Sequence, residues 1–157
     1  MSAYFLTWNP KKSSFTDERY CKEFPESPGN WSIGNLKTAI PQSGDDFFFV
    51  RTGKSQGVRP LGIVGYGTFI GEPYVDRHWE DDKGARGETE MYIDLQWTNQ
   101  VHCLQYPDRV VPWELLLHHG LTDNDRPPQL SMSRYQGDVQ HLKELFDQRQ
   151  RRQGDPD

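Results

Sequence analysis

The chain contains 157 residues, of which 13% are aromatic and five are Trp, and its formal net charge at pH 7 is −5. This length is sufficient for one domain with its own hydrophobic core, and the negative charge argues against a general nucleic-acid coat protein. No apolar run reaches the roughly 20 residues of a membrane span, and the N-terminal segment lacks the features of a signal peptide. Cys21 and Cys103 are isolated in the sequence, so we expect a soluble cytoplasmic protein with reduced thiols.

The first half of the chain predicts three strands and one helix. Residues 3–8 (AYFLTW) are an apolar, β-prone run that predicts a strand. The segment 14–24 predicts a helix with Ser14 as its N-cap. Further strands are predicted at residues 46–51 and 61–70. The last of these alternates Gly with larger residues, which is typical of the bent strands that close a small barrel.

The next part of the chain predicts a strand and a short helix. Residues 91–97 (MYIDLQW) have the composition of a strand. A short helix is predicted over residues 112–119, because Pro112 suits the first helical position and Gly120 suits the position after the last. We expect Trp113 in the core beneath this helix.

The C-terminal segment carries the clearest helical pattern, over residues 137–152 with Asp138 as the N-cap. Its apolar residues form one stripe: Val139, Leu142, Leu145 and Phe146. Strands interleaved with short helices predict a single α+β domain over residues 1–152, followed by a polar tail at 153–157.

Four motifs place this pattern in a family. They are TWNP at 7–10, WSxGNxK at 31–37, EPYxDxHW at 72–79 and PQLSMSR at 128–134. In this order and at these spacings, the chain resembles the EVE/YTH group of PUA-like domains. The resemblance is strongest to the EVE modules that precede HNH nucleases in modification-dependent restriction systems. It spans nearly the whole chain and implies a PUA-like small β-barrel with flanking helices.

The function that this resemblance implies is a non-catalytic reader of nucleic acid. Such a reader flips a modified base, here 5-methylcytosine or 5-hydroxymethylcytosine in DNA, into an aromatic cage. No HNH domain follows in this sequence, so any nuclease activity would belong to an absent domain or to a partner. The alternative is an RNA reader of N6-methyladenine or of a modified tRNA base, because YTH domains place a cage Trp where Trp97 stands. A third, weaker hypothesis is a regulatory module for a small aromatic ligand.

A flipped base needs aromatic faces on which to stack. The candidate cage residues are Trp31, Trp97, Trp8 and Trp79. Trp31 comes first, because it follows Gly29 and Asn30 in a predicted loop. Trp8 and Trp97 fit core packing equally well, and Trp79 also fits a cover over a neighbouring loop.

Polar side chains would read the edge of the base and hold its phosphates. Amides and hydroxyls offer donors and acceptors to a base edge, and the candidates are Ser32, Asn35 and Asn9. Both asparagines also fit ordinary turn chemistry. Basic residues outnumber acidic ones within residues 1–60, and the candidate phosphate contacts there are Lys37, Arg51, Lys54 and Arg59. For any one of these, simple solvation is the alternative.

Catalytic signatures are missing from the sequence. It contains no GxSxG, P-loop or HExxH motif. His118 and His119 end a predicted helix, where cations are favourable, and the acidic run from Glu80 to Asp82 fits a solvated loop. We therefore expect a binding module without catalytic residues, a metal site or a cofactor.

Overall fold

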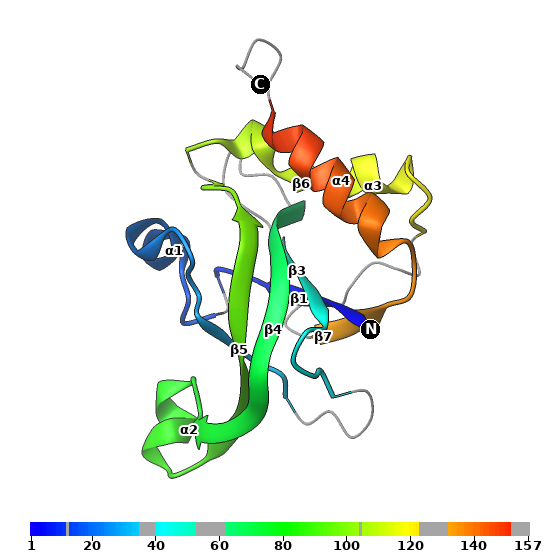
Figure 1. Cartoon of the computed structure of the whole chain (residues 1–157). Coiled ribbons are helices and arrows are strands. Elements are labelled where there is room, and N and C mark those ends of the chain that lie inside the picture. Colours follow the sequence, from blue (N-terminus) through cyan, green and yellow to red (C-terminus); the bar gives the residue numbers. More distant parts are fainter. Residues whose placement is uncertain (12, 35–39, 53–61, 104, 123–131, 152–157) are drawn as a thin grey trace.

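The computed structural model describes residues 1–11, 13–34, 40–52, 62–103, 105–122 and 132–151 (Figure 1). The tail predicted at residues 153–157 lies outside this part of the chain. None of the described helices is long and apolar enough to cross a membrane. The elements, in chain order, are β1 (Ala3–Trp8), α1 (Asp17–Glu23), β2 (Asn30–Ser32), β3 (Asp46–Arg51), β4 (Gly62–Arg77), α2 (Asp81–Ala85), β5 (Thr89–Gln100), the 3-10 turn η1 (Pro107–Arg109), β6 (Val111–Pro112), α3 (Trp113–Leu117), β7 (Met132–Tyr135) and α4 (Val139–Gln150).

The strands form one seven-stranded sheet with the order β2-β5-β4-β3-β1-β7, and β6 pairs with β4. β1 and β3 run parallel, with Ala3 opposite Asp46 and Trp8 opposite Arg51. The other pairings of the described strands are antiparallel. β4 and β5 form a long bent hairpin that carries α2 at its far end (Figure 1). The predicted α+β class and single-domain organisation are confirmed.

The core is built on both faces of β3. Phe47, Phe48 and Phe49 are all fully buried. Phe47 and Phe49 contact Trp97 edge to face at 4.9 and 5.5 Å between ring centroids. Phe48 points the other way and contacts Tyr66 at 5.9 Å. Burial on both faces explains why β3 is a continuous apolar run rather than an alternating one.

The alternating glycines of β4 permit close approach of β5. A Cβ atom on Gly65 would lie 2.6 Å from the ring of Trp97, and one on Gly67 would lie 2.0 Å from the carbonyl oxygen of Gln96. The register between β4 and β5 also shifts next to Gly67. The predicted bend of this strand is seen in Figure 1, and its glycines leave room for the backbone and the Trp97 ring of β5.

The last helix packs on the sheet as predicted. Three of the four residues of its apolar stripe are buried, and Val139 is partly buried against the core. The side chain of Asp138 accepts a hydrogen bond from the backbone N–H of His141 at 3.0 Å, which confirms the N-cap. Lys143 Nζ lies 2.8 Å from Asp46 Oδ1 and so ties α4 to β3.

Two predicted helix starts are wrong. α1 begins at Asp17, and its N-cap is Thr16 rather than Ser14, because the Thr16 hydroxyl accepts from the N–H of Arg19 at 3.2 Å. The segment before it is not helical, since Phe15 is 5% exposed and packs into the core. Pro112 is the N-cap of α3 rather than its first helical residue.

Several strand boundaries also differ from prediction. Trp31 lies in the short strand β2 and not in a loop, because residues 30–32 pair with β5. β4 and β5 continue to Arg77 and Gln100, beyond the predicted limits. The charged segment after Trp79, expected as a loop, contains the five-residue helix α2. The strand residues that were not predicted lie in the β4–β5 hairpin or at the sheet edge. Their strand conformation depends on pairing with a neighbouring strand, which local sequence does not indicate.

Candidate functional site

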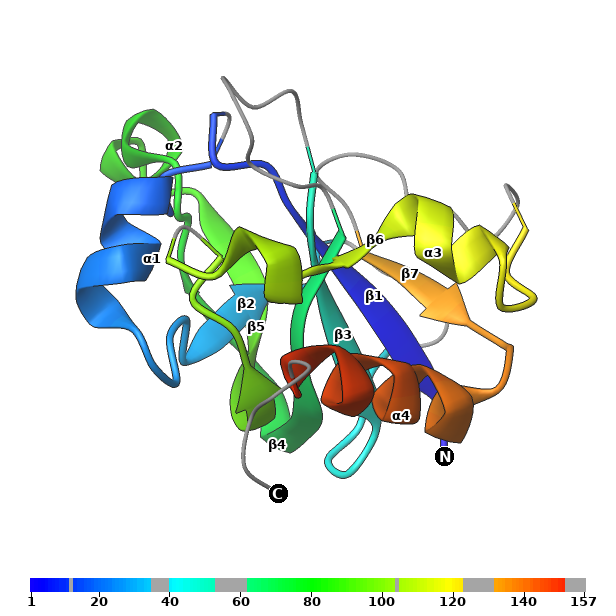
Figure 2. The same cartoon turned by 90° about the horizontal axis from the view of Figure 1, so that it is seen from above.

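A pocket of about 180 Å³ opens beside β2. Its wall comes from three parts of the chain: the segment from β1 to α1, the strand β2, and the β4–β5 hairpin. Figures 1 and 2 place α1, β2 and α2 on the side of the molecule away from α3. We call this cavity the aromatic pocket, because its lining includes Phe15, Trp31, Trp79 and Tyr92.

Trp31 is held by strand pairing and by aromatic packing. It lies opposite Ile93 of β5. Its ring meets Phe49 edge to face at 4.8 Å and Phe15 at 6.2 Å. The residue remains half-buried, so part of the indole is left for a ligand. Edge-to-face contacts of this kind fix the orientation of a ring.

Trp79 is positioned by its neighbour His78. The two rings stack at 5.4 Å between centroids with an interplanar angle of 29°. His78 Nδ1 accepts from the backbone N–H of Glu80 at 3.0 Å, so a neutral ring carries its proton on Nε2. Nε2 in turn lies 3.7 Å from Glu90 Oε2. The histidine of the EPYxDxHW motif therefore orients the indole that follows it.

Two predicted polar residues also line the pocket. Asn9 is 3% exposed, and its Oδ1 accepts from the backbone N–H of Lys11 at 3.1 Å. This is the turn chemistry foreseen as its alternative role, and it coexists with a place in the lining. Ser32 is half-buried on β2 and lines the pocket as well. Asn35 lies outside the described residues.

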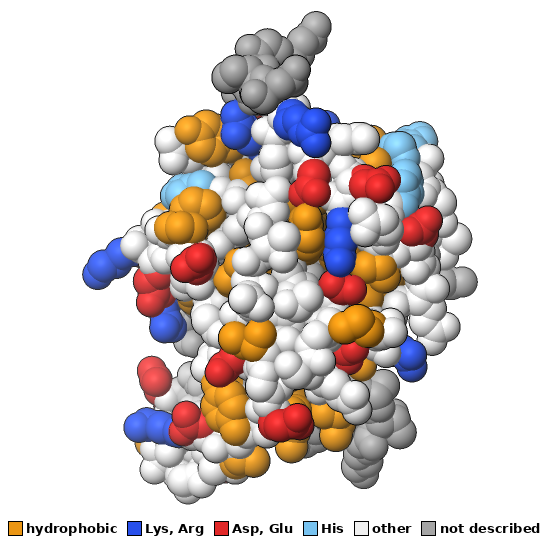
Figure 3. All heavy atoms as spheres, viewed as in Figure 1, with side chains coloured by type: hydrophobic (Ala, Val, Ile, Leu, Met, Phe, Trp, Pro, Cys, Tyr) orange, Lys and Arg blue, Asp and Glu red, His pale blue; other side chains and the backbone are white. Residues whose placement is uncertain are grey.

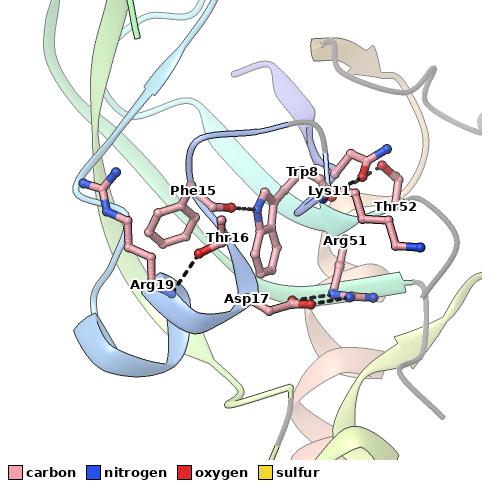
Figure 4. A network of polar contacts seen from close by, with 9 residues as sticks. Trp8, Lys11, Phe15, Thr16, Asp17, Arg19, Arg51 and Thr52 are labelled. Carbon is pink, nitrogen blue, oxygen red and sulfur yellow. Dashed lines mark hydrogen bonds and ion pairs between the residues drawn. The ribbon is translucent and has the colours of Figure 1, made fainter. Parts of the chain in front are cut away.

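Trp8 and Trp97 are not among the lining residues. Trp8 is fully buried and stacks between Tyr20 at 5.0 Å and Phe49 at 5.6 Å. Its Nε1 donates to the carbonyl oxygen of Phe15 at 2.5 Å, so Trp8 supports the pocket wall from within (Figure 4). Trp97 Nε1 donates to the carbonyl oxygen of Pro28 at 2.9 Å. Of the two roles foreseen for each, the structure places both residues in core packing.

Arg51 is buried and does not face solvent as a phosphate contact would. Its side chain is 2% exposed. Its Nε lies 3.1 Å from Asp17 Oδ1 and its Nη2 lies 2.9 Å from Oδ2 (Figure 4). The guanidinium also lies 5.9 Å from the Trp8 ring. A buried charge requires such a partner, and this pair fixes the start of α1 to β3. The other predicted phosphate contacts, Lys37, Lys54 and Arg59, lie outside the described residues.

Arg19 is a pocket residue that the sequence did not single out. It lines the aromatic pocket, its side chain is 55% exposed, and its guanidinium lies 5.4 Å from the Phe15 ring. Its Nε lies 2.8 Å from Glu23 Oε2 on the next turn of α1. Phe15, Asn30 and Tyr92 are further lining residues that were missed. Asn30 stands directly before the WSxGNxK motif, which is the one signal that pointed near it.

No family model and no curated protein matches this chain. Several solved structures do. Human THYN1 in complex with DNA containing 5-methylcytosine matches at 14% identity and a TM-score of 0.60, over 98% of this chain and 100% of that one. The DUF55 domain of human thymocyte nuclear protein 1 and a protein from Pseudomonas putida each match at 16% identity and a TM-score of 0.52. These two alignments cover 94% and 92% of this chain and 98% of each neighbour. The chain therefore has the EVE/PUA-like fold of human THYN1, as its motifs predict.

Proposed function

We propose that this chain is a reader of modified DNA that takes 5-methylcytosine or 5-hydroxymethylcytosine into the aromatic pocket. The observation that carries the proposal is the pocket itself, with two indoles and a phenol beside small polar side chains. Its volume of about 180 Å³ is below the range of about 300–1,000 Å³ for drug-sized ligands. One base suits such a space.

The energetics of base flipping are compatible with this lining. Extruding a base from a duplex costs a few kcal/mol. Stacking on one aromatic side chain returns about 1–3 kcal/mol, and Trp31 and Trp79 both line the cavity. A methyl group buried against an apolar wall adds about 0.8 kcal/mol. The methyl group therefore favours extrusion of the modified base over that of plain cytosine by about 0.8 kcal/mol.

Phosphate contacts would lie at the mouth of this pocket. Arg19 is the exposed cation among the lining residues. Lys37, Lys54 and Arg59 stay predicted phosphate contacts and lie outside the described residues. On the face seen in Figure 3, acidic and basic side chains of the described residues are interspersed, without a continuous basic stripe. A reader with few phosphate contacts agrees with the net charge of −5.

The comparisons support DNA over RNA. A protein of the same fold has been solved with DNA containing 5-methylcytosine, although fold alone does not fix function. Trp97, the residue that favoured an RNA reader of N6-methyladenine, is not among the lining residues and packs on Phe47 instead. We further propose that the chain acts without catalysis, and that a nuclease partner such as an HNH enzyme would perform any cleavage.

A binding screen tests this proposal. One labelled oligonucleotide sequence, as duplex and as single strand, carries cytosine, 5-methylcytosine, 5-hydroxymethylcytosine, adenine or N6-methyladenine at one position. Fluorescence anisotropy should show the tightest binding to duplex with a 5-substituted cytosine. Equal affinity for all probes would contradict a reader, and tightest binding to single-stranded N6-methyladenine would favour the RNA alternative. Incubation of the protein alone with Mg²⁺ or Mn²⁺ should leave every probe uncut.

A further inference from the structure

Asn30, Tyr74 and Asp94 form a chain of hydrogen bonds at the wall of the aromatic pocket. Asn30 lines the pocket and donates from Nδ2 to the Tyr74 hydroxyl oxygen at 2.8 Å. The Tyr74 hydroxyl donates to Asp94 Oδ1, also at 2.8 Å. The three residues come from β2, β4 and β5 respectively. We call this set the amide relay.

The sheet brings the amide relay together through pairing and a bulge. Asn30 lies directly opposite Asp94 in the β2–β5 pair. In the β4–β5 pair, β4 advances four positions from Ile70 to Tyr74 while β5 advances only two, from Asp94 to Tyr92. Gly71 within this bulge has a φ of +72°, which favours Gly. Bulges of this kind re-aim a side chain, and here the side chain is that of Tyr74.

The chemistry of the three groups fixes the direction of both hydrogen bonds. A carboxylate only accepts, so the single hydroxyl proton of Tyr74 goes to Asp94. Burial and the hydrogen bond to Asp94 raise the pKa of Tyr74 above its ordinary value, although the bond from Asn30 opposes this, so the phenol keeps its proton at neutral pH. The Tyr74 oxygen must then accept from Asn30, and only the amide nitrogen can donate. The amide of Asn30 is therefore held in one of its two orientations.

An amide held in this orientation offers a ligand one defined pattern. Its Oδ1 is left as an acceptor, and the second hydrogen of Nδ2 is left as a donor. Cytosine presents the complement, because its exocyclic amino group donates and its ring N3 accepts. Thymine and uracil present the reverse, a carbonyl acceptor beside a ring N–H donor. Asn30 is exposed, so a base in the pocket can reach it.

We propose that the amide relay selects amino-bearing pyrimidines over keto-bearing ones, and so distinguishes 5-methylcytosine from thymine. This inference rests on the proposed reading of a flipped base in the aromatic pocket. A free asparagine could turn its amide to suit either base. The relay removes that choice, because a turned amide would set its oxygen against the Tyr74 oxygen, whose proton is committed to Asp94.

The test separates the methyl group from the amino group in a two-by-two set of probes. Cytosine, 5-methylcytosine, uracil and thymine are each placed opposite an abasic site in one duplex, so that no base pair has to be broken. The wild-type chain should prefer the methylated base of each pair and the amino-bearing base of each pair. The methyl preference reports the proposed function, and the amino preference reports this inference. If the wild-type chain shows the methyl preference without the amino preference, the inference has failed and the proposed function stands. If it shows the amino preference without the methyl preference, the proposed function has failed.

Variants of the relay sharpen the test. Tyr74→Phe releases the amide, so the preference for amino over keto bases should fall by about 2- to 12-fold, the size of one hydrogen bond. Most of the fall should come from tighter binding of uracil and thymine, with the methyl preference unchanged. A merely structural role would weaken all four probes together. Asp94→Asn, at an exposed position, lets residue 94 donate to Tyr74 and should lower the same preference.

A matched control exists on another part of the sheet. Tyr66 donates to Asp147 at 3.0 Å and Asn99 Nδ2 donates to the same carboxylate at 3.0 Å, away from the aromatic pocket. Tyr66→Phe removes a phenol hydroxyl that is also bonded to a carboxylate, and it should leave the methyl preference and the amino preference intact. If Tyr74→Phe and Asp94→Asn, both folded by circular dichroism, keep the wild-type amino preference, the inference is wrong. It is also wrong if the wild-type chain binds thymine and 5-methylcytosine equally.

Discussion

Replacing Trp31 by Ala removes a pocket wall and part of the core at once, and the structure separates the two effects. The indole makes edge-to-face contacts with Phe49 and Phe15 at 4.8 and 6.2 Å. Each such contact contributes about 0.5–1.5 kcal/mol beyond burial. A fully buried Trp→Ala change costs about 3–5 kcal/mol, so this half-buried residue should cost about 2–3 kcal/mol of folding free energy. Because domains have about 5–15 kcal/mol to lose, the variant should stay folded.

The binding loss is of similar size but has a distinct signature. Losing one stacking face should cost about 1–3 kcal/mol of affinity for the modified probe, or roughly 5- to 150-fold. Discrimination between 5-methylcytosine and cytosine should also collapse, since the methyl group is sensed by the same wall. Arg19→Ala should instead weaken both probes alike and lower the slope of log affinity against log salt by about one unit.

Anisotropy titrations at two salt concentrations measure both quantities, and thermal unfolding confirms that each variant is folded. Trp113→Phe is the matched control, because Trp113 is a buried indole that packs on Phe5 at 5.9 Å and is not among the pocket residues. It should lower stability without changing the preference between probes. A folded Trp31→Ala that still prefers 5-methylcytosine would refute the stacking role, and Trp79 would be tested next.

Three further predictions concern the scaffold. Arg51→Met leaves the carboxylate of Asp17 without its buried partner and should cost about 3–5 kcal/mol of unfolding free energy, measured with denaturant. An unchanged denaturation midpoint, together with a lower salt dependence of DNA binding, would instead favour Arg51 as a phosphate contact. Burial raises the pKa of the Cys103 thiol to about 12. At pH 8 a thiol reagent should therefore modify the half-buried Cys21 in the folded protein much faster than the buried Cys103, which should react only after unfolding. Asp138→Ala should cost about 0.5–2 kcal/mol in thermal unfolding through loss of the N-cap of α4, and an unaltered melting temperature would argue against the cap.

Much of the fold was predictable because local pattern and tertiary contact agree. The run of Phe residues in β3 indicates a strand that is buried on both faces, and the structure buries all three. The N-cap and apolar stripe of α4 likewise indicate a helix with one buried face, as the structure has it. The motifs then indicated which arrangement of these elements to expect. They also brought Trp31, Trp79 and Ser32 to one pocket, as the structure has them.

The rest depends on contacts that no local pattern reports. Arg51 is as basic as any surface arginine, and only the approach of Asp17 across 34 residues makes it a buried ion pair. Trp8 and Trp97 are strand residues that fit either a cage or a core, and the packing of β3 decides for the core. Asn30 was passed over because its role arises from Tyr74, 44 positions away and re-aimed by a bulge.

The position of β2 at the end of the sheet has a consequence for how the molecule opens. β2 has three residues and, among the described strands, pairs only with β5. Detaching it breaks few hydrogen bonds, whereas detaching β3 would disrupt strands on both sides. Amides at the sheet edge, such as that of Ile33 bonded to the Met91 carbonyl, should therefore exchange with solvent long before those of β3. The wall that would admit a base therefore lies at an edge of the sheet, and it should open more easily than β3, which has paired strands on both sides.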